Sequence, residues 1–179
     1  MKKENKQLKN FYENIYKKGE EKHYTSFTTS GTPSNEPYEA IKKISWKNKS
    51  VLDVGCGTGL FSFLAAKKGG KVLGIDYSKE AISIAKKKYS HKNLLYKNIN
   101  IKDISKEKFD VIVSLGTLEH MDEPFKMLKI FQKHLKPKGK IIITSPNWTN
   151  PRGYMLIILY LLFDAPITLA DLHYLTPVD

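Results

Sequence analysis

From residue 50 onward, short apolar runs alternate along the chain with longer stretches in which apolar residues recur at helical spacing. The apolar runs have the length and composition of buried strands, and they predict strands at residues 51–54, 71–75, 94–99, 109–115 and 140–144. The stretches between them predict helices at residues 58–68, 78–88 and 124–135. Strands that are apolar on both faces and separated by helices favour an open, mostly parallel sheet covered on both sides. Right-handed crossovers make that α/β sheet doubly wound.

The regions outside this alternating core have a different pattern. Aromatic and apolar residues at helical spacing predict an amphipathic helix near residues 5–18, and a second short helix is expected at 37–44. An apolar stretch, MLIILYLLF, occupies residues 155–163. Because the chain contains no internal repeat and no low-complexity linker, we expect one structural domain. It is made of an N-terminal helical cap (1–47), an α/β core (48–147) and a segment with an apolar helix (148–179).

The charge of the chain raises the question of a nucleic-acid partner. Thirty basic residues against 18 acidic ones give a formal net charge of +12, yet Arg152 is the only arginine. Arginine is the residue best suited to bidentate recognition of phosphates and guanines. The lysines are spread through the predicted helices and are not gathered with aromatic residues, so they indicate solvated helix faces. The sequence therefore disfavours nucleic acid as a partner.

Cysteine content and hydropathy indicate the setting of the protein. The single cysteine, Cys56, excludes an internal disulfide framework and any zinc cluster built from cysteines, and it favours a reducing, cytoplasmic location. Residues 1–10 are polar and predict no signal peptide. The apolar stretch at 155–163 is shorter than the ~20 residues that span a bilayer, so we expect no transmembrane segment. No metal site is expected.

The most informative segment is VLDVGCGTG at residues 51–59, where a glycine-rich turn follows the first predicted strand and opens a helix. Doubly wound sheets bind ligands at this carboxyl edge, and glycines there allow a tight turn and close approach to backbone N–H groups. The third glycine comes one place too early for the dinucleotide fingerprint, and the P-loop sequence is absent. Asp76 follows the second strand and can accept both ribose hydroxyls, or it can cap the next helix. Together, the glycine turn and Asp76 favour a nucleoside ligand.

Four segments in order resemble the class I S-adenosylmethionine-dependent methyltransferases, in particular the subgroup of ubiquinone-type and sugar O-methyltransferases. They are VLDVGCGTG, GIDYS, FDVIVS followed by LEH, and LKPKGK followed by TSPN, within residues 48–147. The resemblance implies a Rossmann-like methyltransferase fold with S-adenosyl-L-methionine as the cofactor. Lys138 stands where that family has glycine. The family fold also has two further strands after the fifth, and we expect these last two strands to be missing from this chain.

The resemblance also implies which residues contact the cofactor. Those of the first motif would lie against the methionine moiety, the carboxylate of the second motif would hold the ribose, and later positions would contact the adenine or offer backbone groups. In chain order the residues implied are Asp53, Gly55, Cys56, Gly57, Gly59, Asp76, Tyr77, Asn100, Ile101, Leu115 and Gly116.

A hydroxyl acceptor must lose its proton during methyl transfer, and a histidine can remove it near neutral pH. His120 is the first candidate because it follows the fourth strand at the edge that carries the glycine turn. Glu119 could orient it, and His173 lies in a segment expected to face the acceptor. The alternative for Glu119 and His120 is a polar helix start.

The sequence thus predicts an S-adenosylmethionine-dependent methyltransferase that acts on a small-molecule acceptor, at oxygen. A cofactor-binding domain that is truncated or non-catalytic is the first alternative. A nucleic-acid methyltransferase is the second, disfavoured because residues 114–117 read SLGT where the amino-methylating enzymes carry N/D-P-P-Y/F. Glycine spacing disfavours a nicotinamide oxidoreductase. A homodimer could form through the 155–163 helix or an exposed sheet edge.

Overall fold

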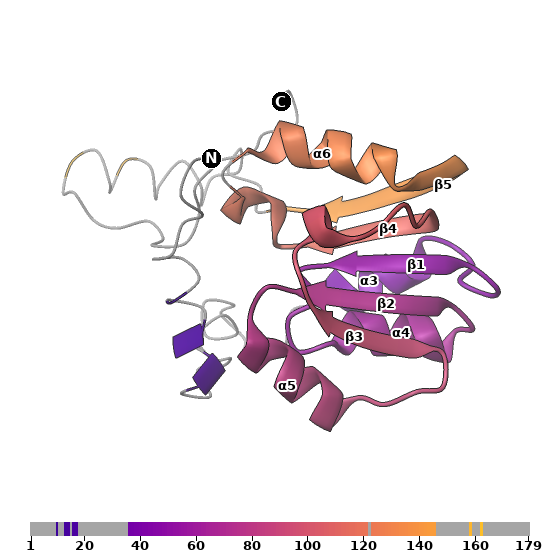
Figure 1. Cartoon of the computed structure of the whole chain (residues 1–179), viewed down its shortest axis with the longest axis horizontal. Helices are drawn as coiled ribbons and strands as arrows, with labels where there is room; N and C mark the ends of the chain where they lie inside the picture. The colour runs from indigo at the N-terminus through magenta and orange to yellow at the C-terminus, as the bar shows by residue number, and fades with distance from the viewer. Residues whose placement is uncertain are drawn as a thin grey trace.

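The computed structural model describes residues 36–121 and 123–145, together with residues 10, 13, 14, 16, 17, 158 and 162. Strands and helices alternate through the continuous part (Figure 1). The elements are, in chain order, α3 (Glu36–Lys42), β1 (Ser50–Val54), α4 (Leu60–Lys67), β2 (Lys71–Asp76), α5 (Lys79–Lys88), β3 (Leu94–Asn98), the 3₁₀ turn η1 (Ile101–Asp103), β4 (Phe109–Leu115), the 3₁₀ turn η2 (Leu118–His120), α6 (Pro124–Lys133) and β5 (Leu135–Thr144).

The five strands of the described residues form one sheet in the order β3-β2-β1-β4-β5, and every neighbouring pair is parallel. The chain moves outward from β1 to β3 and then crosses back to β4, so the order reverses between β1 and β4. Ligands of doubly wound sheets bind at such a switch point, beyond the carboxyl ends of the strands. The predicted fold class, a doubly wound parallel sheet, is confirmed.

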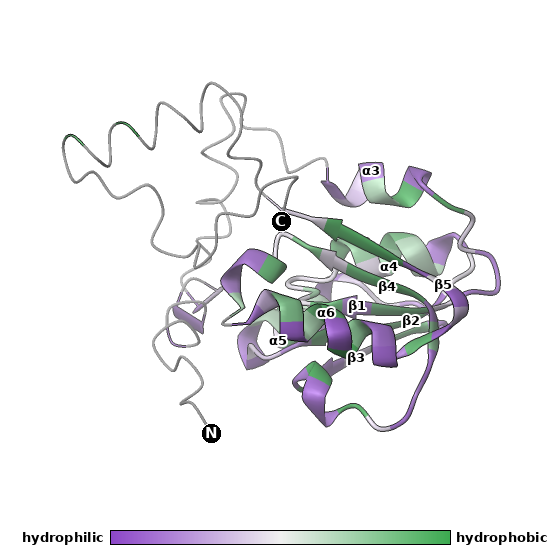
Figure 2. Ribbon diagram, turned by 90° about the horizontal axis from the view of Figure 1, so that it is seen from above, coloured by the Kyte–Doolittle hydropathy of each residue, from purple (hydrophilic) through white to green (hydrophobic). Residues whose placement is uncertain are grey.

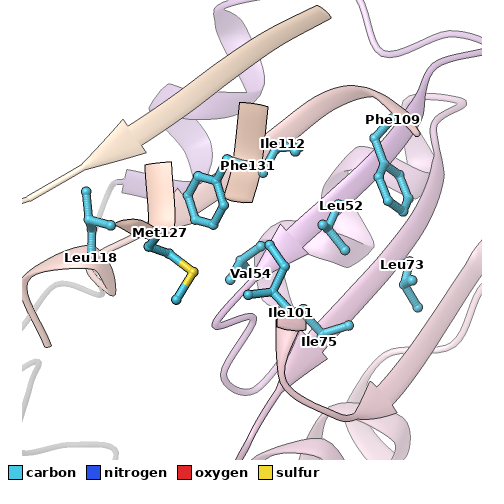
Figure 3. Close-up of a cluster of buried hydrophobic side chains, with 10 residues drawn as sticks. All are labelled: Leu52, Val54, Leu73, Ile75, Ile101, Phe109, Ile112, Leu118, Met127 and Phe131. Carbon is cyan, nitrogen blue, oxygen red and sulfur yellow. The ribbon is translucent and has the colours of Figure 1, made fainter. Parts of the chain in front are cut away.

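Alternation along the strands creates one apolar cluster on each face of the sheet. On β1, Val51 packs with Phe61 of α4 and with Trp46, while Leu52 packs on the opposite face with Phe131 of α6. Figure 3 shows this second cluster, in which η1 and η2 also contribute side chains. The hydropathy colouring shows the same division, with apolar strands inside and polar helix surfaces outside (Figure 2).

Strand β5 differs from its prediction at one end. It starts at Leu135 opposite Phe109, whereas the next paired positions are Val111 and Lys140, so β5 has three extra residues between them. Helix α6 correspondingly ends at Lys133, two residues before the predicted end. The bulged segment contains Lys138 with φ +62°, the left-handed conformation that glycine adopts without strain.

Only isolated residues are described outside the continuous part. Asn10, Glu13, Asn14, Tyr16 and Lys17 have helical backbone conformation, in line with the helix predicted near residues 5–18. In the predicted 155–163 helix, residues 158 and 162 are helical and exposed, and the others lie outside the described residues. Among the described residues, no helix has the length and apolar content needed to span a membrane.

Candidate functional site

The glycine-rich turn after β1 forms the centre of the candidate site. Gly55, Gly57 and Gly59 all have positive φ, at +72°, +51° and +88°, which explains why three glycines occur within five residues. The turn stays close to β2, because the N–H groups of Gly55 and Cys56 both donate to the carbonyl of Ile75, at 2.9 and 3.0 Å. Gly59 then caps α4.

Two side chains from distant segments pack against this turn. A Cβ on Gly55 would lie 2.5 Å from Oγ1 of Thr117, and a Cβ on Gly59 would lie 2.7 Å from Cζ of Tyr96. The Tyr96 hydroxyl also donates to the carbonyl of Gly59 at 2.9 Å, and the pKa of Tyr96 is raised by burial. Sequence reasoning missed Thr117 and Tyr96, since nothing in their own segments shows that they meet the turn.

Asp76 links the turn to the next helix. Its Oδ2 accepts from the N–H of Gly57 at 3.0 Å, and its Oδ1 accepts from the N–H of Ser78 at 2.8 Å. Burial raises the pKa of Asp76 to about 6, although hydrogen bonds from the backbone N–H groups of Ser78, Gly57 and Tyr77 act in the opposite direction. Each carboxylate oxygen can accept a further hydrogen bond. The turn-forming role and a ligand-binding role, which the sequence left as alternatives, are therefore compatible.

Asp53 lies one residue before the end of β1 and is 2% exposed. Its Oδ2 accepts from the hydroxyl of Ser62 on α4 at 2.5 Å. Burial raises the pKa of Asp53 to about 7, with a smaller contribution from the charge of Asp76, while the Ser62 bond lowers it. Burial likewise raises the pKa of the Cys56 thiol, whose side chain packs against the apolar cluster of Ile82, Ala85 and Tyr96.

Two described residues of the N-terminal region lie near the site, Glu13 against the start of α5 and Tyr16 against the glycine turn. Oε1 of Glu13 accepts from the N–H of Lys79, the first residue of α5, at 2.9 Å. The hydroxyl of Tyr16 would be 3.3 Å from a Cβ on Gly57. The sequence predicted a helix here but did not place it at the site. Glu13 and Tyr16 are three residues apart, so they share one face of a helix, and this spacing was the only indication in the sequence that both could contact the same surface.

A second group of residues meets at the end of β4. Gly116 has φ +53°, and its N–H donates to Thr144 of β5, at 3.1 Å to the carbonyl and 3.0 Å to Oγ1. A Cβ on Gly116 would lie 3.7 Å from Oε2 of Glu36 and 3.9 Å from Oε1 of Glu119. Glu119 is 2% exposed and His120 is half-buried at the end of η2. Sequence reasoning missed Glu36.

The other residues that the sequence predicted for the site have differing structural roles. Oδ1 of Asn100 accepts from the N–H of Lys102 at 3.0 Å and caps η1. Ile101 is buried with its side chain in the core cluster (Figure 3), so only its backbone could face a ligand. Tyr77 is half-buried directly after β2. His173 lies outside the described residues.

The arrangement offers backbone N–H groups and buried carboxylates at one edge of the sheet. Asp53 and Asp76 would attract a cationic ligand, and the glycine turn leaves room for it to approach the backbone. Within the described part of the chain, no three side chains of His, Cys, Asp or Glu come together as a metal-binding group would require. The edge is therefore suited to a polar organic ligand with a positive charge.

Comparison with known proteins agrees with this chemistry. Residues 45–166 match a family described as "Methyltransferase domain". The ubiquinone biosynthesis O-methyltransferase of Coxiella burnetii is 36% identical over 122 residues, which are 66% of this chain and 52% of that protein. The protein of the same name from Actinobacillus pleuropneumoniae is 37% identical over 120 residues, 62% of this chain and 51% of its own. The chain thus spans about half the length of these curated relatives.

Solved structures give the same result. A putative S-adenosylmethionine-dependent methyltransferase from Listeria monocytogenes is 31% identical with a TM-score of 0.57, covering 63% of this chain and 55% of its own. The magnesium protoporphyrin IX methyltransferase of Synechocystis has a TM-score of 0.59 over 72% of this chain and 68% of its own. At 16% identity, the latter shows a common fold only.

Proposed function

The chain belongs to the class I family of S-adenosylmethionine-dependent methyltransferases, and from this premise we propose that it transfers the methyl group of S-adenosylmethionine to an oxygen of a small molecule. The observation that carries the proposal is the hydrogen bond from the N–H of Gly57 to Oδ2 of Asp76. It holds the glycine turn and a buried carboxylate together at the edge of the sheet where the strands end. The relatives named for O-methylation in ubiquinone biosynthesis support oxygen as the methylated atom.

The residues around the turn fit such a cofactor. The free acceptor positions of Asp76 would bind the ribose hydroxyls, and Tyr77 and Asn100 would flank the adenine. The backbone of the glycine turn would bind the methionine moiety, where a Cβ on Gly57 would fill the space beneath the Tyr16 hydroxyl. The cofactor supplies an electrophilic methyl group on a sulfonium centre, and the carboxylates of Asp53 and Asp76 complement its positive charge.

On the acceptor side, we propose that His120 acts as the general base. In this transfer the acceptor oxygen would take the methyl group of the bound cofactor, and the electron pair of the carbon–sulfur bond would remain with sulfur. The hydroxyl proton passes to an imidazole nitrogen of His120. Glu119, adjacent to His120 in η2 and buried, would keep the imidazole oriented. Leu115 and Gly116, at the end of β4, would contact the cofactor through their backbones, and His173 would face the acceptor.

Calorimetric titration of the full chain with S-adenosylmethionine, S-adenosylhomocysteine and NAD tests cofactor binding. We expect the first two to bind and NAD not to bind, and the opposite result would contradict the proposal. Asp76→Ala should weaken binding about 100-fold, because hydrogen bonds to a charged group contribute about 1.5–3 kcal/mol each. Asp110→Ala is the matched control at the other edge of the sheet, and it should leave cofactor affinity unchanged.

Transfer of a labelled methyl group into a metabolite extract separates an enzyme from a binding module. His120→Gln should reduce kcat about 10²–10⁴-fold while cofactor affinity stays the same. If the chain binds the cofactor but labels no metabolite, the non-catalytic alternative is correct. If it labels RNA in place of small molecules, the nucleic-acid alternative is correct.

We also retain the homodimer and the cytoplasmic location as proposals. Ile158 and Leu162 are four residues apart in helical conformation, and both are exposed, at 52% and 69%. Side chains at this spacing share one helix face, which a second copy would cover. The single cysteine supports a reducing compartment.

A further inference from the structure

The edge of the sheet opposite the candidate site is strongly basic. At this edge the helices end and the strands begin, and we call its five segments, residues 42–50, 67–71, 86–93, 104–110 and 133–140, the amino edge. They contain 17 lysines but only two acidic residues, Glu107 and Asp110. Sixteen of these lysines are exposed, and the other, Lys136, is half-buried and pairs with Asp110 at 2.9 Å.

The acidic residues have the opposite distribution. The described part has nine other acidic residues. One is Glu13, and the others lie in the first turns of α3 and α5, in η1 and η2, at the start of α6, and in the later halves of β1 and β2. All of these positions are on the side of the sheet where the strands end. The described part is therefore polarised along the strand direction, with negative charge near the site and positive charge at the amino edge.

Helix stabilisation explains only part of this pattern. Lysines in the last turn of a helix interact favourably with its dipole, and Lys42, Lys67, Lys86–Lys88 and Lys133 are placed in this way. Lys43 and Lys68 directly follow α3 and α4 and share this effect, but the other nine lysines of the amino edge lie in loops and strand starts, where no dipole favours them. A lysine-rich composition explains how many lysines the chain has, but it does not explain why they collect at one edge.

The amino edge also contains a hollow of about 540 Å³ lined by Ile104, Ser105, Lys106, Lys108, Lys133 and His134. A hydrogen bond joins the two sides of the hollow: Nζ of Lys108, in the loop before β4, donates to the carbonyl of Lys133, at the end of α6, at 2.5 Å. Nδ1 of His134 lies 2.9 Å from the carbonyl of Glu107. The hollow is therefore a fixed, positively charged depression between the β4-preceding loop and the end of α6.

We propose that the amino edge binds the phosphodiester backbone of double-stranded nucleic acid without sequence preference. Lysines act as point charges on phosphate, and the absence of arginine from these segments excludes bidentate base readout. None of the large hydrophobic side chains exposed in the described part lies in the five segments. The surface therefore offers neither an aromatic platform for unstacked bases nor an apolar anchor for a bilayer.

This inference differs from the expectation drawn from the sequence. There the lysines are interpreted as solvated residues spread through the helices, and nucleic acid is disfavoured as a partner. The inference goes beyond the proposed function, because the hollow and the glycine turn are at opposite edges of the sheet. Bound nucleic acid would be a partner that localises the protein, and the methyl acceptor would still reach the site. Binding is expected to be the same with and without S-adenosylmethionine.

Fluorescence anisotropy of the full chain with a labelled 20-base-pair duplex of mixed sequence tests the proposal. Affinity should fall with salt at a slope of about −0.9 per phosphate contact on a log–log plot. Lys106→Gln, Lys133→Gln and Lys140→Gln combined should weaken binding about tenfold or more and reduce the slope by two to three contacts. The matched control combines Lys97→Gln, Lys102→Gln and Lys129→Gln, three exposed lysines outside the amino edge, and should bind nearly as the parent does.

Both triple variants lose three positive charges. If both bind the duplex equally weakly, the effect comes from net charge alone and the proposal is overturned. Thermal melting of each variant establishes that it is folded before its affinity is compared. Binding to vesicles of anionic phospholipid but not to the duplex would overturn it in favour of a membrane surface, and binding to neither would overturn it outright. Because no cofactor is needed, failure here leaves the proposed methyl transfer untouched.

Discussion

The two edges of the sheet are built from the same kind of segment, a loop between a helix and a strand, yet their carboxylates have opposite effects on the stability of the fold. At the carboxyl edge, the three glycines Gly55, Gly57 and Gly59 have positive φ, and burial raises the pKa of Asp53 and Asp76. The buried carboxylates oppose folding when they are charged, while the glycine turn and the carboxylates together create room and charge for a ligand.

At the amino edge, a carboxylate stabilises the fold. Oδ2 of Asp110 accepts from the N–H and hydroxyl of Ser50, at 2.8 and 2.7 Å, and from Nζ of Lys136, at 2.9 Å. These hydrogen bonds, those from Ser50 foremost, hold the pKa of Asp110 well below its usual range, and they join β1, β4 and β5. The comparison teaches that the site is destabilising in itself and depends on stabilising contacts elsewhere.

The largest contrast between the edges should appear between two glycines with nearly the same φ angle. Gly59 and Gly69 have φ of +88° and +90°, but a Cβ on Gly59 would meet the buried ring of Tyr96, whereas one on Gly69 would lie 3.3 Å from Cα of Lys47. Gly59→Ala should lower the free energy of unfolding by about 3 kcal/mol through strain and overpacking, and Gly69→Ala by about 1 kcal/mol through strain. Urea unfolding measures both values.

The same pair of variants separates stability from binding. Gly59→Ala should also abolish cofactor binding in calorimetry, because the turn must move away from Tyr96. Gly69→Ala should bind the cofactor as the parent chain does. Equal losses of stability in the two variants would show that the packing of Tyr96 against the turn does not matter.

Removal of the amino-edge carboxylate should have the next largest effect. Asp110→Ala breaks three hydrogen bonds to a partly exposed charge and should lower the free energy of unfolding by about 2 kcal/mol at pH 7. Because the folded pKa is lowered, this contribution is present above the unfolded pKa near 3.8 and is lost as the pH falls below it. Denaturant titrations at pH 3 and pH 7 should therefore show a larger difference from the parent at pH 7.

Asp53 should show the opposite pH dependence. Its folded pKa is raised to about 7 from 3.8, so its contribution to stability is fully present below pH 3.8 and is lost as the pH rises through 7. Asp53→Asn removes this loss, and the variant should be more stable than the cofactor-free parent at pH 8 by about 1–2 kcal/mol. At pH 5 the two should differ less. A variant that is less stable at pH 8 would mean that the charged carboxylate has stabilising partners.

The smallest effect is expected in the bulge of β5. Lys138 has φ +62°, and a residue with a side chain in this conformation is strained by about 1–2 kcal/mol. Glycine removes the strain but loses more conformational entropy on folding. Lys138→Gly should therefore raise the free energy of unfolding by about 0.5–1 kcal/mol, measured by thermal melting, with no change in cofactor affinity. A decrease would show that the bulge is not under strain.

Local patterns were enough to predict much of this structure. Strand β4 has the predicted ends, and the other strands and the helices α4, α5 and α6 lie within a few residues of their predictions. Ser78 caps α5 as predicted, with its hydroxyl accepting from the N–H of Ala81 at 3.1 Å. These features depend on residues close in sequence, and so the chain itself reveals them. The bulge in β5 was missed because Pro137 and Gly139 resemble an ordinary turn between helix and strand.

The residues of the candidate site also fall into two groups, those that local sequence patterns reveal and those that only the fold brings to the site. The glycine turn and Asp76 are recognisable in the sequence because their spacing of 21 residues reflects one strand–helix–strand unit. Tyr96, Thr117 and Tyr16 are not recognisable, since they reach the turn from β3, from the loop after β4 and from the N-terminal region. Their packing against the turn follows from strand order, which a local pattern does not contain.

The sequence by itself determined the fold class, the glycine turn, the pairing of that turn with an acidic strand end, and the family. It also determined the number of lysines, which it assigned to solvated helix faces. Only the tertiary structure decided that these lysines lie together at one edge and the carboxylates at the other. The physical reason is that all five strands are parallel, so every helix end and strand start comes to the same side of the sheet.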